Sequence, residues 1–420
     1  MKVLITGAGI SGSALAFWLA KLGHTVTVIE RFPSLRATGL QLDLRGHGIE
    51  VMKRMGLESA YRAKAIAEQG MQVVDSSGRR RAWFPVNNTG KGTQSFSTEW
   101  ELLRGDMCTT LYERASREGA EYVFGTTVEK VMQEGELVHV WFKNGRTADF
   151  DLVVGADGVG SRMRKMILGS ETKDGFVRLP GLYVAYFTCK LPMQEGEQNI
   201  ATMYTATNKR GIMTRRNNPR EVQVYIGGTV HTGRLADAKP GDVEEEKEAL
   251  AELFQGAGWR CDEIVRGMRD CKDFYCERMG MVKLEHWSNG RIALTGDAAW
   301  CPTANTGMGT SSSMVGAYIL AGEIATHCSP SDGGEGLEAA LKGYEDRFKP
   351  FMEQVQKGVE EGSWDNMPSS KFGLGVMNIL LGIVSFFRID IVKYMLKEKV
   401  YDWELPAYKE LPECKDIANM

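Results

Sequence analysis

The chain has 420 residues, a formal net charge of −3, 43% hydrophobic and 25% charged residues. This length exceeds one compact core and predicts two domains, or one large domain with an insertion. The composition is that of an ordinary globular protein, and the small net charge argues against a nucleic-acid partner. The eight cysteines form no C-x-x-C pair, which predicts reduced thiols and a cytoplasmic protein, and the six scattered histidines predict no metal site.

The N-terminal segment has the pattern of a βαβ unit. Residues 2–6 predict a buried strand, residues 11–22 a helix that Gly23 ends, and residues 25–30 a second strand rich in β-branched side chains. Such a unit predicts two parallel strands joined by a right-handed crossover.

A glycine motif, Gly7-Ala8-Gly9-Ile10-Ser11-Gly12, lies between that strand and that helix. Gly7 permits a tight turn, Gly9 lets a pyrophosphate approach the backbone, and Gly12 lets the helix pack closely on the strand. Glu30 ends the second strand eighteen residues after Gly12, and its carboxylate can bind the hydroxyls of an adenosine ribose. The segment therefore predicts a bound dinucleotide, and it leaves FAD and NAD as alternatives.

The middle of the chain adds further elements of the same sheet. We expect helices at 46–55 and 103–117, a strand at 121–124, and a hairpin of strands 137–142 and 147–150 around Asn144-Gly145. A buried strand at 151–154 then leads to Asp157, at the end of the sheet where ligands bind. The alternative for Asp157 is an Asx turn beside surface arginines.

The pattern changes between residues 181 and 277. Short alternating segments at 182–188, 211–215 and 222–226 predict an antiparallel sheet. Rossmann-like features return with a strand at 291–295.

A third glycine-bearing segment, Gly296-Asp297-Ala298-Ala299, follows this last strand. Asp297 can accept hydrogen bonds from the hydroxyls of a polyol. Gly307, Met308, Gly309 and Thr310 then open a long helix at 309–327, whose first amides suit the negative pyrimidine edge of a reduced flavin. The alternative is an ordinary capped helix after a turn.

Helices at 337–358 and 376–396 close the chain. Residues 372–387 are almost wholly apolar but near the lower length limit for a membrane span. We therefore favour a buried or interdomain helix over a membrane contact there.

The three motifs, in this order, resemble the class A flavoprotein monooxygenases with the para-hydroxybenzoate hydroxylase fold. The family patterns are an N-terminal G-x-G-x-x-G with a distant Glu, a central D-G-x-x-S-x-x-R, and a late G-D-A-A followed by P and G-x-G. Gln41-Leu42-Asp43-Leu44, followed by residues 46–57, is similar to the branch of tetracycline-inactivating monooxygenases.

The resemblance implies an α/β fold with a Rossmann-like FAD domain, an inserted antiparallel β-rich substrate domain and C-terminal helices. We expect the FAD domain at 1–70, 101–180 and 278–335, the substrate domain at 71–100 and 181–277, and the helical region at 336–420.

Cofactor contacts are also implied by the resemblance. Arg36 is a candidate NADPH contact, and Trp300 stands where the family usually has His. The implied cofactor-binding residues are Gly7, Gly9, Ile10, Ser11, Gly12, Glu30, Arg31, Asp43, Arg104, Asp157, Arg164, Asp297, Gly307, Met308, Gly309 and Thr310.

The implied activity belongs to secondary metabolism. NADPH or NADH reduces FAD, and a flavin C4a-hydroperoxide formed with O₂ oxygenates a small aromatic or polyketide-like substrate in a monomer or homodimer. Tyr186 and Tyr225 are the candidate catalytic residues of the β-rich region, and Met213 is a candidate pocket residue.

A flavin-dependent halogenase is one alternative, although Trp83-Phe84-Pro85 is only a fragment of its tryptophan motif. A non-oxygenating flavoprotein and an NAD-dependent dehydrogenase are the others.

Overall fold

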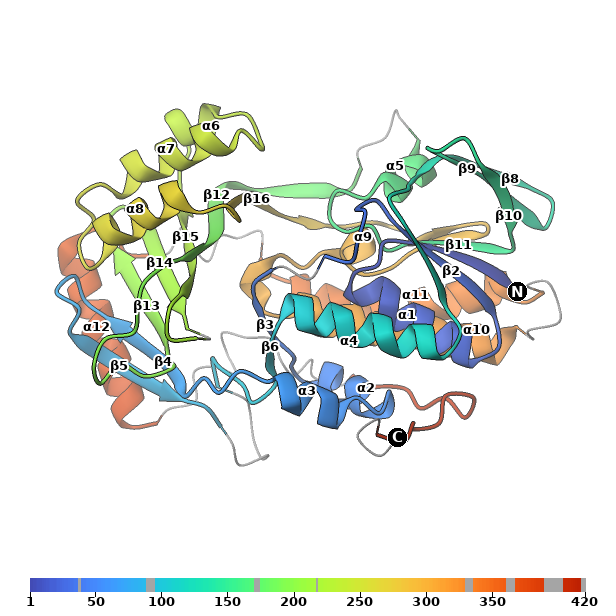
Figure 1. Ribbon diagram of the computed structural model, residues 1–420, viewed down its shortest axis with the longest axis horizontal. Helices are drawn as coiled ribbons and strands as arrows, with labels where there is room; N and C mark the ends of the chain where they lie inside the picture. Colours follow the sequence, from blue (N-terminus) through green and yellow to red (C-terminus); the bar gives the residue numbers. More distant parts are fainter. Residues whose placement is uncertain are drawn as a thin grey trace.

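Two large β-sheets organise the chain, as the computed structural model in Figure 1 shows. The structure describes residues 1–36, 39–87, 95–169, 174–216, 218–328, 335–359, 367–388 and 403–416.

The first sheet has six strands in the order β17-β18-β11-β1-β2-β7. They are β1 (Lys2–Thr6), β2 (Thr25–Glu30), β7 (Glu121–Phe124), β11 (Leu152–Gly155), β17 (Ser288–Asn289) and β18 (Ile292–Leu294). Strand β1 pairs in parallel with both β2 and β11, and β11 pairs in parallel with β18. The predicted βαβ unit is confirmed, and the late strand rejoins the sheet as expected.

Helices cover one face of this sheet and a small antiparallel sheet covers the other (Figure 1). The helices are α1 (Ile10–Lys21), α4 (Arg104–Arg117), α10 (Gly309–His327) and α11 (Leu337–Gln356), and the small sheet has β8 (Val128–Glu134), β9 (Leu137–Phe142) and β10 (Thr147–Phe150). Helix α1 packs against both α4 and α10, so ten of its twelve residues are buried. A helix with neighbours on several sides needs apolar residues all round.

The second sheet has seven strands in the order β16-β12-β15-β14-β13-β4-β5. They are β4 (Gly70–Val74), β5 (Arg80–Pro85), β12 (Phe176–Cys189), β13 (Ala201–Ala206), β14 (Arg210–Arg215), β15 (Val222–Thr229) and β16 (Tyr275–Val282). All neighbours are antiparallel except β13 and β4, which confirms the predicted antiparallel character.

Alternation along these strands separates two faces. One face packs under α7 (Val243–Phe254) and α8 (Cys261–Asp270), with α6 (Arg234–Asp237) beside them. Val222, Val224 and Ile226 of β15 belong to this buried cluster. The residues between them, Gln223 and Tyr225, therefore point to the opposite face.

A short ribbon of β3 (Gln41–Asp43) and β6 (Glu101–Leu103) links the two sheets. Strand β3 leads into α2 (His47–Arg54) and α3 (Glu58–Lys64). In the first sheet, α5 (Arg162–Leu168) follows β11 and α9 (Asp297–Trp300) follows β18, and the 3₁₀ turn η1 (Ala304–Thr306) precedes α10.

Helix α12 (Lys371–Phe386) corrects one prediction. We expected a buried or interdomain helix at 372–387, but Leu374 is the one buried residue of α12, and the helix lies on the surface against β5 (Figure 1). The rest of the helix expected at 376–396 lies outside the described residues from position 389 on. Among the helices that the structure describes, none combines the length and the apolar composition needed to cross a bilayer.

We predict that Gly12→Ala will lower the free energy of unfolding by about 3 kcal/mol, because an added Cβ must displace backbone. A Cβ placed on Gly12 would lie 2.0 Å from the carbonyl oxygen of Gly7. Chemical denaturation followed by circular dichroism measures the change. Gly160→Ala is the matched control, since a Cβ there meets open space. Equal unfolding midpoints for the two variants would contradict the close packing of α1 on β1.

Candidate active site

The start of α1 is an open anion-binding cradle. Gly7 has φ +108°, and a Cβ on it would lie 2.4 Å from the carbonyl oxygen of Ala156. Gly9 precedes the helix and provides no side-chain cap. The first amides of α1 are thus left for a ligand.

Arg104 lies over this cradle. Its Nη2 atom is 3.9 Å from a Cβ placed on Gly9, and its buried Nη1 atom has no hydrogen-bond partner among the described residues. A buried guanidinium donor without a partner is costly, so the position favours an anionic ligand. The cradle and the unpaired donor together fit the pyrophosphate of a dinucleotide.

Glu30 is fixed at the end of β2 beside the cradle. Its carboxylate accepts hydrogen bonds from the amides of Ala8 and Phe32, each at 3.1 Å. These contacts connect it to the glycine turn, in the position expected of a ribose-binding carboxylate.

Two more cations gather near Glu30. The guanidinium groups of Arg31 and Arg36 lie 4.9 Å and 5.3 Å from the centre of the Phe32 ring. Partial burial, followed by the charges of Arg104 and Arg31, lowers the pKa of Arg36 below its ordinary value. A bound phosphate would relieve this repulsion.

The segment at Asp297 packs directly on the glycine motif. A Cβ on Gly296 would lie 2.7 Å from the Cβ of Ser11, and the Ser11 hydroxyl is 3.0 Å from that of Thr295. The side chain of Ser11 therefore connects the first and third motifs. Burial raises the pKa of Asp297, while Cys301 and Arg104 oppose the rise.

The start of α10 is a second helix N-terminus without a side-chain cap. Gly307 adopts the left-handed conformation (φ +65°) that turns the chain into the helix. Met308 is 1% exposed, so its side chain belongs to the core and only its backbone faces the turn. The amides of Gly309 and Thr310 are in the first turn, where a helix has no internal acceptors.

Asp157 and Arg164 have mainly internal contacts. Asp157 accepts hydrogen bonds from the Ser161 hydroxyl and the amides of Arg162 and Met163, which caps α5. The guanidinium of Arg164 is buried and donates to the carbonyls of Asp174, Ala298 and Val159. Arg164 thereby fixes the segment that carries Asp297, so we infer that its influence on a cofactor is indirect.

Trp300 is a core residue. It is 1% exposed and packs against Trp287, Tyr344 and Phe348, with ring centroids 4.6, 5.9 and 5.0 Å away. The replacement of the usual family His by Trp therefore fills the space between α10 and α11.

The open face of the seven-stranded sheet carries an aromatic cluster. Tyr186 and Tyr225 are direct cross-strand neighbours with ring centroids 5.6 Å apart, and Tyr275 stacks on Tyr186 at 6.2 Å. Burial raises the pKa of Tyr225 to about 12 and that of Tyr186 further. Both phenols therefore stay protonated at neutral pH and can donate hydrogen bonds.

Glu277 completes this cluster and was not predicted from the sequence. It lies on β16, two residues from Tyr275 and hence on the same face. Burial, reinforced by the nearby charge of Asp297, raises the pKa of Glu277 to about 7, although a hydrogen bond from Tyr186 opposes the rise. The acidic residue thus connects the aromatic cluster to the third glycine segment. The alternation of residues along β16 places Tyr275 and Glu277 on one face, but the sequence does not predict which face of the strand meets the first sheet.

The linking ribbon fixes the other side of the cluster. The Tyr225 hydroxyl donates to the carbonyl of Gln41 at 3.2 Å, and the Gln41 amide donates to the side chain of Gln223 at 2.7 Å. Asp43, at the end of the same strand, accepts from Arg45 at 3.0 Å. The predicted residues Asp43 and Tyr225 are therefore on adjoining segments.

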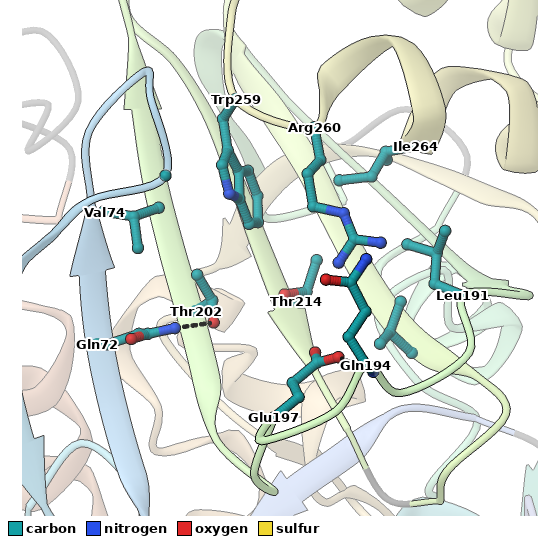
Figure 2. A pocket seen from close by; sticks show the side chains of 12 residues that line it. Gln72, Val74, Leu191, Gln194, Glu197, Thr202, Thr214, Trp259, Arg260 and Ile264 are labelled. Atoms are coloured by element: carbon teal, nitrogen blue, oxygen red, sulfur yellow. Dashed lines mark hydrogen bonds between the residues drawn. The ribbon is translucent and has the colours of Figure 1, made fainter.

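Two cavities lie elsewhere. Figure 2 shows one of about 260 Å³ between α8 and the helix-covered face of the sheet, with Trp259 and Arg260 opposite Thr202 and Thr214. The other, of about 340 Å³, lies between α11 and the segment before β18, beside Trp300. Neither is lined by the tyrosines or Glu277, so neither is the candidate active site.

Comparisons with known proteins match this arrangement. Residues 1–359 match the family described as FAD binding domain. The chain is 48% identical to the FAD-dependent monooxygenase asL4 of Sarocladium schorii, across 98% of this chain and 99% of that protein. It is 37% identical to the flavin-dependent monooxygenase eupH of Phoma sp, across 92% of each chain.

A solved structure shares both fold and sequence similarity. Tetracycline destructase Tet(55) superposes with a TM-score of 0.76 at 27% identity, across 97% of this chain and 98% of that one. The predicted α/β fold and flavoprotein resemblance are confirmed. The chain belongs to the FAD-binding-domain family and is an FAD-dependent monooxygenase.

Proposed function

We propose that the enzyme consumes NADPH or NADH and O₂ to oxygenate an electron-rich phenol or enol of an aromatic or polyketide-like compound. The observation that carries this proposal is the buried carboxyl group of Glu277, which lies on the same face of β16 as Tyr275 of the aromatic cluster and is affected by the charge of Asp297. The bound FAD supplies the redox chemistry by accepting hydride and activating O₂.

The binding role of each residue is part of this proposal. The α1 cradle with Arg104 would bind the pyrophosphate, Glu30 the ribose, and Asp297 the ribityl chain. Arg31 and Arg36 provide positive charge for the phosphates of FAD or of the nicotinamide cofactor. Asp43 and the start of α10 would face the flavin ring.

The division into domains is likewise proposed. The seven-stranded sheet supports a substrate domain made of two separate segments, since β4 and β5 join strands β12 to β16. Strands β12 and β16, the second of which carries Glu277, extend from this sheet toward the six-stranded one (Figure 1).

Glu277 has the properties of a proton acceptor. A group whose pKa lies near the working pH exchanges protons efficiently. The proton of the substrate hydroxyl would pass to the Glu277 carboxylate, and the resulting phenolate or enolate is a stronger nucleophile toward an electrophilic oxygen. The rings of Tyr186 and Tyr275 provide apolar surface for a planar substrate.

The relatives support this substrate class. Tet(55) is named for tetracycline, a fused-ring compound with phenol and enol groups. The names of asL4 and eupH specify a monooxygenase, and nothing in the site favours the halogenase or the non-oxygenating flavoprotein.

The first test is the visible spectrum of the FAD-loaded protein. We expect the flavin absorption to bleach on anaerobic addition of NADPH or NADH and to return when air is admitted. A screen of phenols should then find a compound that gains one oxygen atom, measured by mass spectrometry. Reoxidation without an oxygenated product from any phenol or enol would contradict the proposed substrate class.

Arg104→Ala should weaken FAD binding by roughly tenfold to a hundredfold, because a charge-assisted hydrogen bond contributes about 1.5–3 kcal/mol. Titration of the apoprotein with FAD measures the dissociation constant. Arg117→Ala, at the exposed end of the same helix, is the control. If both variants bind FAD as tightly as the unmodified protein, Arg104 does not contact the cofactor.

Glu277→Gln should lower kcat/KM by about 10²-fold or more, since a general base contributes on that scale. The carboxylate is the active form and its pKa is about 7, so kcat/KM of the unmodified enzyme should rise with pH through neutrality. The variant should lose this inflection and keep only the ionisation of the substrate. Glu285→Gln, on an exposed side chain, is the control. An unchanged pH profile in Glu277→Gln would remove Glu277 from this role.

A further inference from the structure

Helix α12 carries the largest gathering of exposed apolar side chains on the described part of the molecule. Twelve large hydrophobic residues are exposed on the described part of the molecule, and seven of them lie between positions 372 and 387. Among these, Phe372 and Phe386 are 83% and 80% exposed. We call this surface the apolar stripe; it consists of Phe372, Val376, Ile379, Leu380, Ile383, Phe386 and Phe387. Spacings of three and four residues place these side chains on one side of the helix.

The opposite side of α12 is attached to the seven-stranded sheet. Leu381 and Val384 pack against a small core cluster that includes Val73 and Phe84. The Ser385 hydroxyl accepts from the amide of Trp83 at 2.9 Å and donates to its carbonyl at 2.8 Å. These contacts fix the rotation of the helix, so the apolar stripe points away from the protein.

Cations border the apolar stripe. No charged residue occurs between Phe372 and Phe387, but Lys371 and Arg388 lie at its two ends and are exposed. The run Arg79-Arg80-Arg81 is exposed on the adjacent hairpin, and the Arg81 carbonyl is 3.0 Å from a Cβ placed on Gly382. Asp75 forms an ion pair with Arg81, which leaves this border with an excess of positive charge.

We propose that the apolar stripe docks the protein on the surface of a lipid bilayer that contains anionic headgroups. A helix of 16 residues is shorter than a span requires, whereas it suits a position in the plane of the interface. Phenylalanine and isoleucine side chains would enter the acyl region. The flexible Lys and Arg side chains at the border would reach the phosphate groups.

The charge pattern favours lipid over a second copy of the chain. Because α12 has a cation at each end, both the parallel and the antiparallel packing of two stripes place cation against cation. Like charges in contact oppose association. Anionic headgroups neutralise the same cations.

Vesicle flotation with the FAD-loaded full chain tests the proposal. We expect binding to vesicles of phosphatidylcholine mixed with phosphatidylserine, and weaker binding to phosphatidylcholine alone or at high salt. Ile379→Glu should weaken partition at least about tenfold, because burial of one such side chain contributes that factor or more. Arg80→Gln should lower the phosphatidylserine-dependent part about fivefold.

Met132→Glu is the matched control, since Met132 is an exposed apolar residue on β8. It should bind vesicles like the unmodified protein. Leu380→Gln provides a second, milder change in the stripe should Ile379→Glu lose its FAD or its circular dichroism spectrum. The proposal is overturned if the protein does not float with vesicles, or if Met132→Glu loses as much vesicle binding as Ile379→Glu. It is also overturned if the protein forms dimers without lipid and Ile379→Glu dissociates them. Flavin bleaching with NADPH is measured separately, so failure here is distinct from failure of the proposed oxygenase.

Discussion

A single buried guanidinium, that of Arg215, fixes the seven-stranded sheet against the linking ribbon. It donates to both oxygens of Glu68, at 2.8 and 3.1 Å, and forms an ion pair with Glu101 of β6. Glu68 also accepts hydrogen bonds from Ser97 and from Gln41 at 3.2 Å. A buried ion pair offsets its desolvation only when such additional bonds are present, and loss of one partner typically costs about 3–5 kcal/mol. The network therefore determines where the ribbon meets the sheet.

The geometry of the active site follows from that junction. With β3 fixed, the carbonyl of Gln41 accepts from the Tyr225 hydroxyl. Arg45 connects the ribbon to α10, since its guanidinium donates to Asp43 and its backbone amide donates to the Ser311 hydroxyl at 2.8 Å. Because Tyr186 and Tyr225 are cross-strand partners, fixing one positions the other, and Glu277 lies on the next strand, where the charge of Asp297 acts on it. The close approach of α1 to β1 supplies the anion cradle on the facing side.

Local signals account for what could be predicted from the sequence. Strands 2–6 and 25–30 and the helix at 309–327 have the predicted bounds, because their local patterns (an apolar run closed by glycine, a β-branched run, and a glycine-opened apolar segment) specify these elements without help from distant residues. Residues whose role depends on tertiary contacts were less predictable. The protein partners of Arg164, the carbonyls of Asp174 and Ala298, are supplied by segments that its motif does not contain.

The exposure of helix α12 was also not predictable from the sequence. An apolar run of its composition usually belongs to a core, and hydropathy alone does not reveal that only one side has a partner. Glu277 is a parallel case: its alternation with Tyr275 was visible, but its raised pKa depends first on burial and then on Asp297, twenty residues later in the chain and on another element. The surroundings of Glu277 and of α12 are therefore both set by the faces of the seven-stranded sheet.

One row of side chains across that sheet connects the proposed active site to the proposed membrane surface. Cross-strand pairing aligns Tyr275, Tyr186, Tyr225, Met213, Met203, Val73 and Ala82 from β16 to β5. Direct cross-strand partners point to the same face, so the row is continuous from the tyrosines to the cluster beneath α12. Its far half is apolar and its near half carries hydroxyl groups beside Glu277. The far half is covered by α12, so the part of the row left for a substrate is the near half with Tyr186 and Tyr225.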